Sequence, residues 1–298
     1  EGQLWYNSTS GDFKVGTAGA GAWSSGNTLN TARGELAGIG TTPAALACGG
    51  NPGGTLSETY DGSTWTEGSD LNTSRKGMQA TGSTTAGMVV GGSGVTATEY
   101  YDGTSWSSQT GTITRGGGDQ SFGIAGASQA SALIFGGEPG TTYAKYSETW
   151  NGTSWSEGNR LNSNRASAGG VGIVTAALAC GGYSPGVVTN VESYDGTSWT
   201  ETSTDINSAR AAMGSSGTAT AALIFAGTPF GALTESFDGT TWTELADLAT
   251  GREYVGNSQS PTNANTSALA FGGLTPSATN ATEAWTDPVY TIKTVTVS

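Results

Sequence analysis

Short apolar runs recur along almost the whole chain, and each one stops at a glycine. Examples are residues 44–48, 87–90 and 131–135. Runs of this length are typical of β-strands, because a helix needs a longer segment with an apolar position every three to four residues. No polar residue alternates with the apolar ones, so we expect these strands to lie in the middle of packed sheets.

A second motif follows each of these runs. It consists of glutamate, an aromatic residue two positions later, Asp-Gly or Asn-Gly, and a tryptophan seven residues after the glutamate, and it occurs at residues 58–67, 99–108, 148–157, 192–201 and 235–244. Glycine tolerates positive φ, and the Asp or Asn side chain can bond the backbone of its own turn. Each copy therefore predicts two short strands joined by a tight β-turn.

Tryptophans mark the period of the repeat. They stand at positions 23, 65, 106, 155, 199 and 242, at intervals of 41 to 49 residues. A repeat of this length with four short strands is typical of a propeller blade. The sixth unit lacks a tryptophan strand of its own, because Asp287-Pro288 follows Trp285 where the turn is expected. We expect the strand around Trp23 to fill that place, which would leave no open sheet edge.

The sequence therefore predicts an all-β fold, a six-bladed β-propeller of four-stranded antiparallel blades whose last blade is closed by the N-terminal strand around Trp23. Three segments follow from this prediction. Residues 1–22 are an N-terminal hairpin and linker, residues 23–288 are the propeller, and residues 289–298 are a C-terminal strand that leaves the propeller and can pair with the hairpin.

Composition and charge narrow the class of partner. Glycine accounts for 49 of the 298 residues and charged residues for 12%, which favours turns and strands over helices. The net charge of −13 repels phosphate groups, so we expect no nucleic acid as a partner. The apolar runs are too short to cross a bilayer, which predicts no membrane insertion. The chain has no histidine, so we expect no bound metal and no cofactor.

Gly-Gly, an aromatic residue with Asp-Gly, and tryptophan at a period in the forties together resemble the kelch repeat over residues 23–285. The resemblance implies blades with the arginine region on the inner strand, Gly-Gly at the end of the second, the glutamate segment on the third and tryptophan on the outer strand. The opening segment 2–7 (GQLWYN) and the Gly/Ser/Thr-rich composition also look like tail-fibre and other virion-surface proteins of bacteriophages.

Six of the seven arginines occupy one position of the repeat, nine to eleven residues after tryptophan. We interpret them as a structural network with the repeat glutamates, because the planar guanidinium group suits carboxylate and carbonyl partners. The alternative, suggested by the six-bladed fucose lectins, is that arginine, glutamate and aromatic residues bind sugar between blades. The arginines are Arg33, Arg75, Arg115, Arg165, Arg210 and Arg252, and the glutamates are Glu58, Glu99, Glu148, Glu192, Glu235 and Glu283.

The repeat tryptophans are interpreted as packing between blades, and sugar-stacking platforms are the alternative. They are Trp23, Trp65, Trp106, Trp155, Trp199 and Trp242. Cys48 and Cys180 belong to the first and fourth blades, on opposite sides of a six-bladed ring. We therefore expect two buried free thiols rather than a disulfide.

Two enzyme classes share this type of fold, and the residues argue against both. Sialidases need three arginines that converge on one carboxylate and a Tyr–Glu nucleophile pair, whereas the arginines here are spread evenly around a ring. Their Asp-containing turn also differs from residues 195–199, where Asp stands only four positions before Trp. Copper-radical oxidases need histidine ligands, which this chain lacks. We therefore expect no enzymatic activity.

Loops between the Gly-Gly strand and the glutamate strand carry the most irregular sequence, at residues 138–147, 183–191 and 228–234. Binding residues usually lie on loops held by a rigid scaffold, and aromatic faces beside hydrogen-bonding groups suit sugar rings. The candidate binding residues are Glu138, Tyr143, Tyr146, Tyr183 and Phe230. The alternative is that these loops are only variable and solvated.

These inferences predict a non-enzymatic structural or binding module on a phage virion appendage, such as a tail fibre. It would contact a cell-surface glycan or another virion protein, at the virion surface or outside the cell. One alternative is an extracellular microbial adhesion module that resembles a lectin. A glycan-processing, sialidase-like tail enzyme is the third hypothesis.

Overall fold

The computed structural model describes residues 4–10, 12–18, 21–114, 122–138, 143–259, 265–287 and 290–295. The described secondary structure is all β, in seven antiparallel sheets of which six have four strands and one has three. This confirms the all-β prediction, and the arrangement is consistent with a propeller-like repeat. Among the described residues no helix is long and apolar enough to cross a membrane.

The four-stranded sheets follow the repeat along the chain. The first contains β4 (Ala37–Thr41), β5 (Ala44–Cys48), β6 (Ser57–Tyr60) and β7 (Trp65–Glu67). The second contains β8 (Gln79–Ser83), β9 (Ala86–Val90), β10 (Ala97–Tyr101) and β11 (Trp106–Thr112). The third contains β12 (Phe122–Ser128), β13 (Ser131–Gly136), β14 (Ser147–Trp150) and β15 (Trp155–Glu157).

The next sheets repeat this order, with one exception in the last. The fourth contains β16 (Gly169–Ile173), β17 (Ala176–Cys180), β18 (Val191–Tyr194) and β19 (Trp199–Glu201). The fifth contains β20 (Gly214–Thr218), β21 (Ala221–Phe225), β22 (Thr234–Phe237) and β23 (Trp242–Glu244). The sixth contains β24 (Gly256–Asn257), β25 (Ser267–Phe271), β26 (Thr282–Thr286) and β3 (Ala22–Gly26).

Strand β3 joins the two ends of the repeat region. It pairs antiparallel with β26, so that Trp23 lies opposite Trp285 and Ser25 lies opposite Glu283. The expected pairing of the strand around Trp23 with the last repeat is thus confirmed. The sixth sheet therefore brings together residues from both ends of the chain.

The first strands of the six sheets contact one another in chain order, from β4 to β24, and β24 also contacts β4. The inner strands therefore form a ring, with each sheet covered by its two neighbours. Small residues on these strands permit the close approach. A Cβ atom added at Gly38 would lie 2.2 Å from the carbonyl oxygen of Asn257, and one at Gly170 would lie 2.3 Å from that of Ile124.

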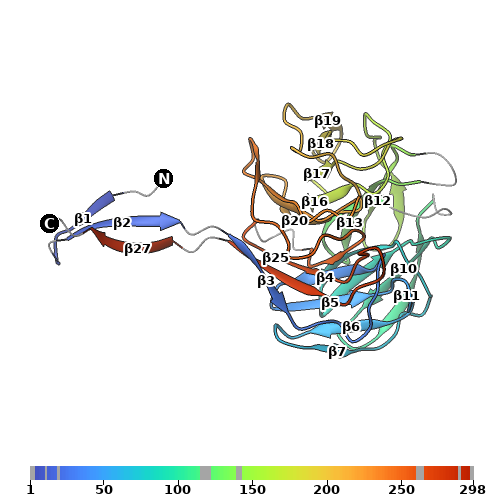
Figure 1. Cartoon of the computed structure of the whole chain (residues 1–298). Helices are drawn as coiled ribbons and strands as arrows, with labels where there is room; N and C mark the ends of the chain where they lie inside the picture. The colour runs from blue at the N-terminus through green and yellow to red at the C-terminus, as the bar shows by residue number, and fades with distance from the viewer. Residues whose placement is uncertain are drawn as a thin grey trace.

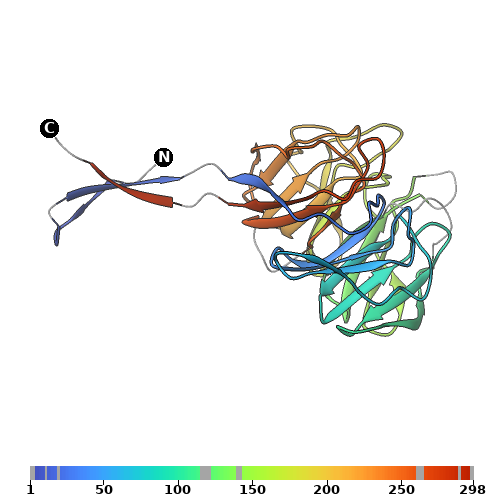
Figure 2. The same ribbon diagram turned by 60° about the horizontal axis from the view of Figure 1, so that its bottom comes forward.

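The seventh sheet, made of β1 (Leu4–Asn7), β2 (Asp12–Ala18) and β27 (Tyr290–Val295), stands away from the other six (Figures 1 and 2). Strands β1 and β2 form a hairpin, and β27 pairs with β2. The side chains of Tyr6, Phe13 and Val295 are exposed on it. Tyr6 lies opposite Phe13 in the pairing register, and Phe13 lies opposite Val295.

A buried ion pair lies in each of five sheets. The Nη2 atom of Arg165 is 2.7 Å from Oε1 of Glu192, and Nη1 donates to the carbonyls of Gly181 and Asn190. Both charged side chains are about 1% exposed, so these bonds replace the water that each group loses. The pairs are Arg33–Glu58, Arg75–Glu99, Arg165–Glu192, Arg210–Glu235 and Arg252–Glu283.

The sixth pair is not complete in the described chain. Arg115 lies outside the described residues, and its expected partner Glu148 accepts hydrogen bonds from the backbone and the hydroxyl group of Thr114. The repeat glutamates thus also receive donors from the segment just before the arginine. In the fourth sheet these donors are the backbone N–H groups of Asn162 and Ser163.

The repeat tryptophans pack against the preceding sheet. Trp65 lies with its ring centroid 4.9 Å from that of Phe271, and its Nε1 donates to the Thr282 hydroxyl at 3.0 Å. Trp23 and Trp155 bond threonines at the equivalent position, Thr234 and Thr98. Where this position holds serine or valine instead, the tryptophan Nε1 is buried without a partner; these tryptophans are Trp106, Trp199 and Trp242.

The Asp-Gly segment of the repeat serves as a turn. In the first copy Asp61 Oδ1 accepts hydrogen bonds from the backbone of Ser63 and Thr64, at 2.8 and 2.7 Å. These backbone donors lower the pKa of Asp61, and the same arrangement lowers the pKa of Asp102, Asp195 and Asp238. Each carboxylate is thus occupied by its own turn.

The two cysteines are free and fully buried, as the sequence predicts. Burial raises the pKa of both thiols, Cys48 and Cys180, to about 12. Both residues therefore act as small apolar side chains rather than as nucleophiles.

We expect Arg165→Met to destabilise the protein by about 3–5 kcal/mol, because it leaves the Glu192 carboxylate buried without a counter-charge. Chemical denaturation followed by tryptophan fluorescence measures this change. Arg160→Met is the matched control, since Arg160 and Glu157 form an ion pair whose side chains are about half exposed. That control should lose about 1 kcal/mol or less. Equal losses in the two variants would contradict the structural role of the buried pair.

We expect Val191→Thr to stabilise the protein by about 1 kcal/mol, because the new hydroxyl group can accept the hydrogen bond that Trp242 Nε1 lacks. Val191 and Trp242 share one apolar cluster, and Val191 is 1% exposed. The control is Val90→Thr beside Trp155, whose indole already bonds Thr98. The hydroxyl group of Val90→Thr would be buried without a free partner and should lower stability by about 1–3 kcal/mol. If thermal unfolding shows an equal loss of stability in both variants, the expectation is refuted.

Candidate functional site

In the five repeats where this position is described, the residue two positions after the arginine lies at the mouth of the ring of inner strands. We call the five described residues, Glu35, Gly77, Ser167, Ala212 and Tyr254, the axial ring. The backbone N–H groups of four of them bond the carbonyl of a neighbour: Glu35 to Tyr254, Gly77 to Glu35, Ala212 to Ser167 and Tyr254 to Ala212, at 2.8–3.1 Å. The hydrogen bonds run across the junction between the last repeat and the first.

The backbone of the axial ring is left-handed. The φ angles are 56° at Glu35, 53° at Ser167, 53° at Ala212 and 52° at Tyr254, and Gly77 has 64°. A residue with a Cβ atom is disfavoured in this region by about 1–2 kcal/mol relative to ordinary helical backbone. Strained residues gather at functional sites when the surrounding structure holds them in place. Four such residues at one mouth therefore point to a binding site there.

A hollow opens from the axial ring toward the face that carries the Gly-Gly loops. Its outer part, which we call the vestibule, measures about 410 Å³, within the range of about 300–1,000 Å³ typical of small-molecule sites. Its inner part, the inner pocket, measures about 60 Å³. Glu35, Gly77, Ser167 and Tyr254 line both parts, and we refer to the two together as the funnel.

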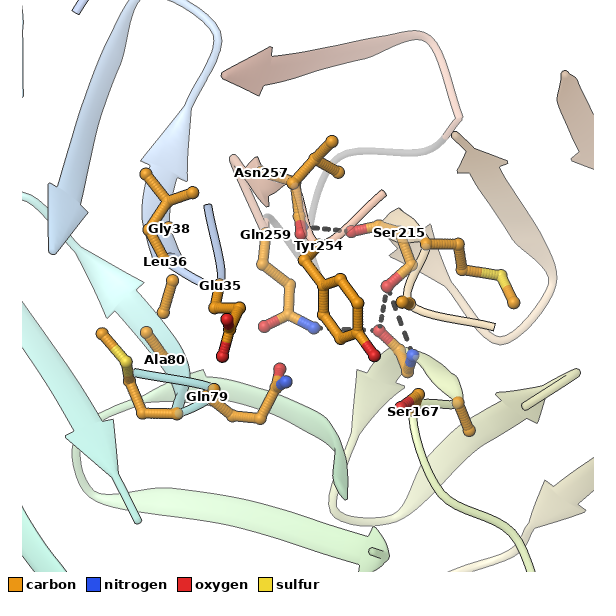
Figure 3. A pocket seen from close by; sticks show the side chains of 18 residues that line it. Glu35, Leu36, Gly38, Gln79, Ala80, Ser167, Ser215, Tyr254, Asn257 and Gln259 are labelled. Carbon is orange, nitrogen blue, oxygen red and sulfur yellow. Dashed lines mark hydrogen bonds between the residues drawn. The ribbon is translucent and has the colours of Figure 1, made fainter. Parts of the chain in front are cut away.

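Apart from Glu35, the polar residues that line the inner pocket are uncharged. Gln79 projects toward it from the second sheet, and Asn257 and Gln259 project from β24 of the sixth sheet and the segment that follows it (Figure 3). Nδ2 of Asn257 donates to the carbonyl of Ser215 at 2.6 Å. The Gln79 carboxamide makes no hydrogen bond within the described part of the chain, so it is available to a bound molecule.

The vestibule combines two aromatic rings with charged groups. The rings of Tyr143 and Tyr183 are 5.4 Å apart in an edge-to-face arrangement. Desolvation, and then the nearby Tyr183 and Glu138, raise the pKa of Tyr143, so its phenol stays protonated at neutral pH. Nζ of Lys76 lies 3.0 Å from the Glu35 carboxylate. The vestibule therefore presents two aromatic rings beside carboxylate and ammonium groups.

The structure brings together three of the five candidate binding residues. Glu138, Tyr143 and Tyr183 line the vestibule. Tyr146 does not line it and instead lies under Arg160, with the guanidinium carbon 4.5 Å from the ring centroid. Phe230 is 43% exposed, but it lies on a loop that turns back on itself through the bond from Gly231 N–H to the Gly227 carbonyl, outside the funnel lining. Pro139 to Thr142 lie outside the described residues.

The sequence reasoning did not identify Glu35, Gln79, Tyr254 or Gln259. For the first and third of these the repeat offers one signal, because the residue two positions after arginine differs from copy to copy, as glutamate, glycine, serine, alanine or tyrosine. No comparable signal marks Gln79 or Gln259. Their positions hold alanine or glycine in other described repeats, and only the fold directs them to the axis.

The charged groups of the repeat have structural partners, so the funnel is the part of the described chain best suited to hold a ligand. Within that part of the chain, no three His, Cys, Asp or Glu side chains gather closely enough to hold a metal ion. Phenol, carboxylate, hydroxyl and carboxamide groups can donate and accept hydrogen bonds with an uncharged polar ligand.

No protein-family model matches the chain, and no curated protein matches it with significant similarity.

We expect Ala212→Gly to stabilise the protein by about 0.5–1 kcal/mol, because glycine adopts positive φ without steric strain. Differential scanning calorimetry would measure the shift in melting temperature. Ala222→Gly is the control, since Ala222 lies fully buried in the middle of the fifth sheet. Removal of its methyl group should lower stability by at least about 1 kcal/mol. If Ala212→Gly also lowers stability, strain at the axial ring is not the explanation for its backbone.

Proposed function

We propose that this chain is a six-bladed kelch-like β-propeller that serves as a non-enzymatic binding module on a bacteriophage virion appendage and binds a cell-surface glycan through the funnel. The six four-stranded sheets and the contacts of their inner strands support the propeller. The likeness of the opening segment and of the composition to virion-surface proteins supports the placement on a virion.

The observation that carries the binding function is the vestibule with its pair of tyrosines. Tyr143 and Tyr183 offer aromatic faces or edges beside the carboxylate of Glu138. Sugar rings present apolar C–H faces and hydroxyl groups at the rim, so a ring can contact the tyrosines while its hydroxyl groups bond the polar lining. A hollow of about 410 Å³ accommodates a ligand of this size.

The non-enzymatic part of the proposal rests on how the ionisable groups of the repeat are used. Five arginines each pair with a glutamate of their own sheet, so they do not converge on a single carboxylate. The four turn aspartates bond their own backbone. These groups act as parts of the scaffold, and the funnel contributes hydrogen-bonding groups and aromatic surface.

The three-stranded sheet supports a place on a larger assembly. It projects from one side of the ring and holds the six sheets away from its own tip (Figures 1 and 2). Its exposed apolar side chains Tyr6, Phe13 and Val295 suit contact with another protein surface. The six four-stranded sheets would then face the cell, while the three-stranded sheet faces the appendage.

We expect the protein to bind glycans on a printed array, and Tyr183→Ala to weaken binding of the best ligand about 30-fold, the loss typical of an aromatic anchor worth about 2 kcal/mol. Phe230→Ala is the control, because Phe230 is a similarly exposed aromatic residue outside the funnel lining. It should bind as the parent does. Lack of binding to every glycan, or release of shortened oligosaccharide during incubation, would refute the proposal.

A further inference from the structure

The side chain of Gln259 closes the bottom of the funnel. Its Nε2 atom donates to the carbonyl of Ile124 in the third sheet and to that of Gly170 in the fourth, both at 2.9 Å. Gln259 itself follows β24 of the sixth sheet, which lies opposite the third in a ring of six. The side chain therefore crosses the axis, and it is 7% exposed.

Local structure explains why Gln259 reaches the axis. Strand β24 has only two residues, whereas β4 and β16 have five. The chain leaves the strand at Ser258, whose backbone N–H bonds the carbonyl of Leu269 and whose hydroxyl group accepts from Leu269 N–H. This capped end directs the next side chain inward, where four of the other repeats have glycine at the same distance from arginine.

A chain of sugars cannot pass through a funnel closed in this way. The vestibule admits a ring-sized group, and the inner pocket of about 60 Å³ admits only a small substituent. A ligand must therefore enter from the vestibule side and end there. The shape selects the end of a glycan chain rather than a segment from its middle.

The groups around the inner pocket select for an uncharged end. Gln79 points its carboxamide into the pocket and has no hydrogen bond with the described residues, while the Gln259 side chain forms the floor of the pocket (Figure 3). A carboxamide both donates and accepts, which matches hydroxyl and acetamido groups. A free carboxamide in a recessed pocket is a polar group that a ligand can satisfy.

The charge of the vestibule also favours an uncharged ligand. Glu35 and Glu138 line it with one ammonium group, that of Lys76, which pairs with Glu35. Beside it, the carboxylate of Glu253 accepts a hydrogen bond from the Thr228 hydroxyl at 2.6 Å. With a net charge of −13 on the chain, a sugar acid meets electrostatic repulsion.

We infer that the funnel recognises the uncharged terminal sugar of a glycan chain, with the sugar ring in the vestibule beside Tyr143 and Tyr183 and one polar substituent, a hydroxymethyl or acetamido group, bonded to Gln79 in the inner pocket. This inference rests on the proposed function, because the funnel is already proposed to bind glycans. It adds that the bound part is the end of the glycan chain and that this end is uncharged.

The test uses an array of neutral oligosaccharides that end in glucose, galactose, mannose, N-acetylglucosamine or N-acetylgalactosamine, each printed beside the same chain capped with sialic acid. We expect binding to at least one neutral end and at least about tenfold weaker binding to its capped form. Isothermal titration calorimetry with the neutral ligand and Gln79→Met should show about three- to tenfold weaker affinity, the loss of one hydrogen bond.

Gln109→Met is the matched control, because Gln109 lies on β11 in the outer part of the second sheet. It should bind as the parent does, and both variants should melt within about 2 °C of it. Equal binding of capped and uncapped chains, or unchanged affinity in Gln79→Met, would overturn the inference. If Tyr183→Ala still weakens binding in that case, the proposed function stands. Lack of binding to any glycan would overturn both.

Discussion

A buried arginine in five of the repeats fixes the relative position of separate pieces of chain. The guanidinium group of Arg165 bonds the carbonyls of Gly181 and Asn190 on either side of a loop, and the carboxylate of Glu192 on the next strand. Its own backbone carbonyl accepts the N–H of Gly137 from the preceding sheet, at 2.8 Å. A charge that is almost fully buried is tolerated only when its bonds are complete. The strands are therefore held in one register, and each sheet is fixed against its neighbour.

The geometry of the funnel depends on these arginine bonds. The arginine carbonyl and the Gly-Gly pair set the path of the chain, and two residues later the backbone is left-handed and bonded to the next repeat. None of these bonds involves the side chain at that position. The scaffold can therefore carry glutamate in one repeat, serine in another and tyrosine in a third, as Glu35, Ser167 and Tyr254 show. The chemistry of the mouth can change while its shape stays the same.

The repeat explains how much of this could be predicted from the sequence. The spacing of glutamate, turn and tryptophan defines the strands and reveals the pairing of the strand around Trp23 with the last repeat, because these features depend on local propensities and on counting. The site depends on directions in space. Tyr143 and Tyr183 could be placed on the correct face as loop residues, but Gln79 and Gln259 sit in strands or at strand ends. Their approach to one axis follows only from the assembled ring.

A ring of similar repeats also limits where a distinctive site can form. Any cleft between two sheets occurs about six times, so a residue that recurs in every cleft, such as the repeat tryptophan or arginine, serves all of them alike and is best explained by packing. The axis occurs once. There residues from several repeats line the same space, and differences between repeats add up to one asymmetric surface instead of six similar ones. The carboxamide of Gln259, held across the axis by carbonyls of two other sheets, shows the consequence. A shortened strand in one repeat is enough to change the depth and the chemistry of a site that all the repeats share.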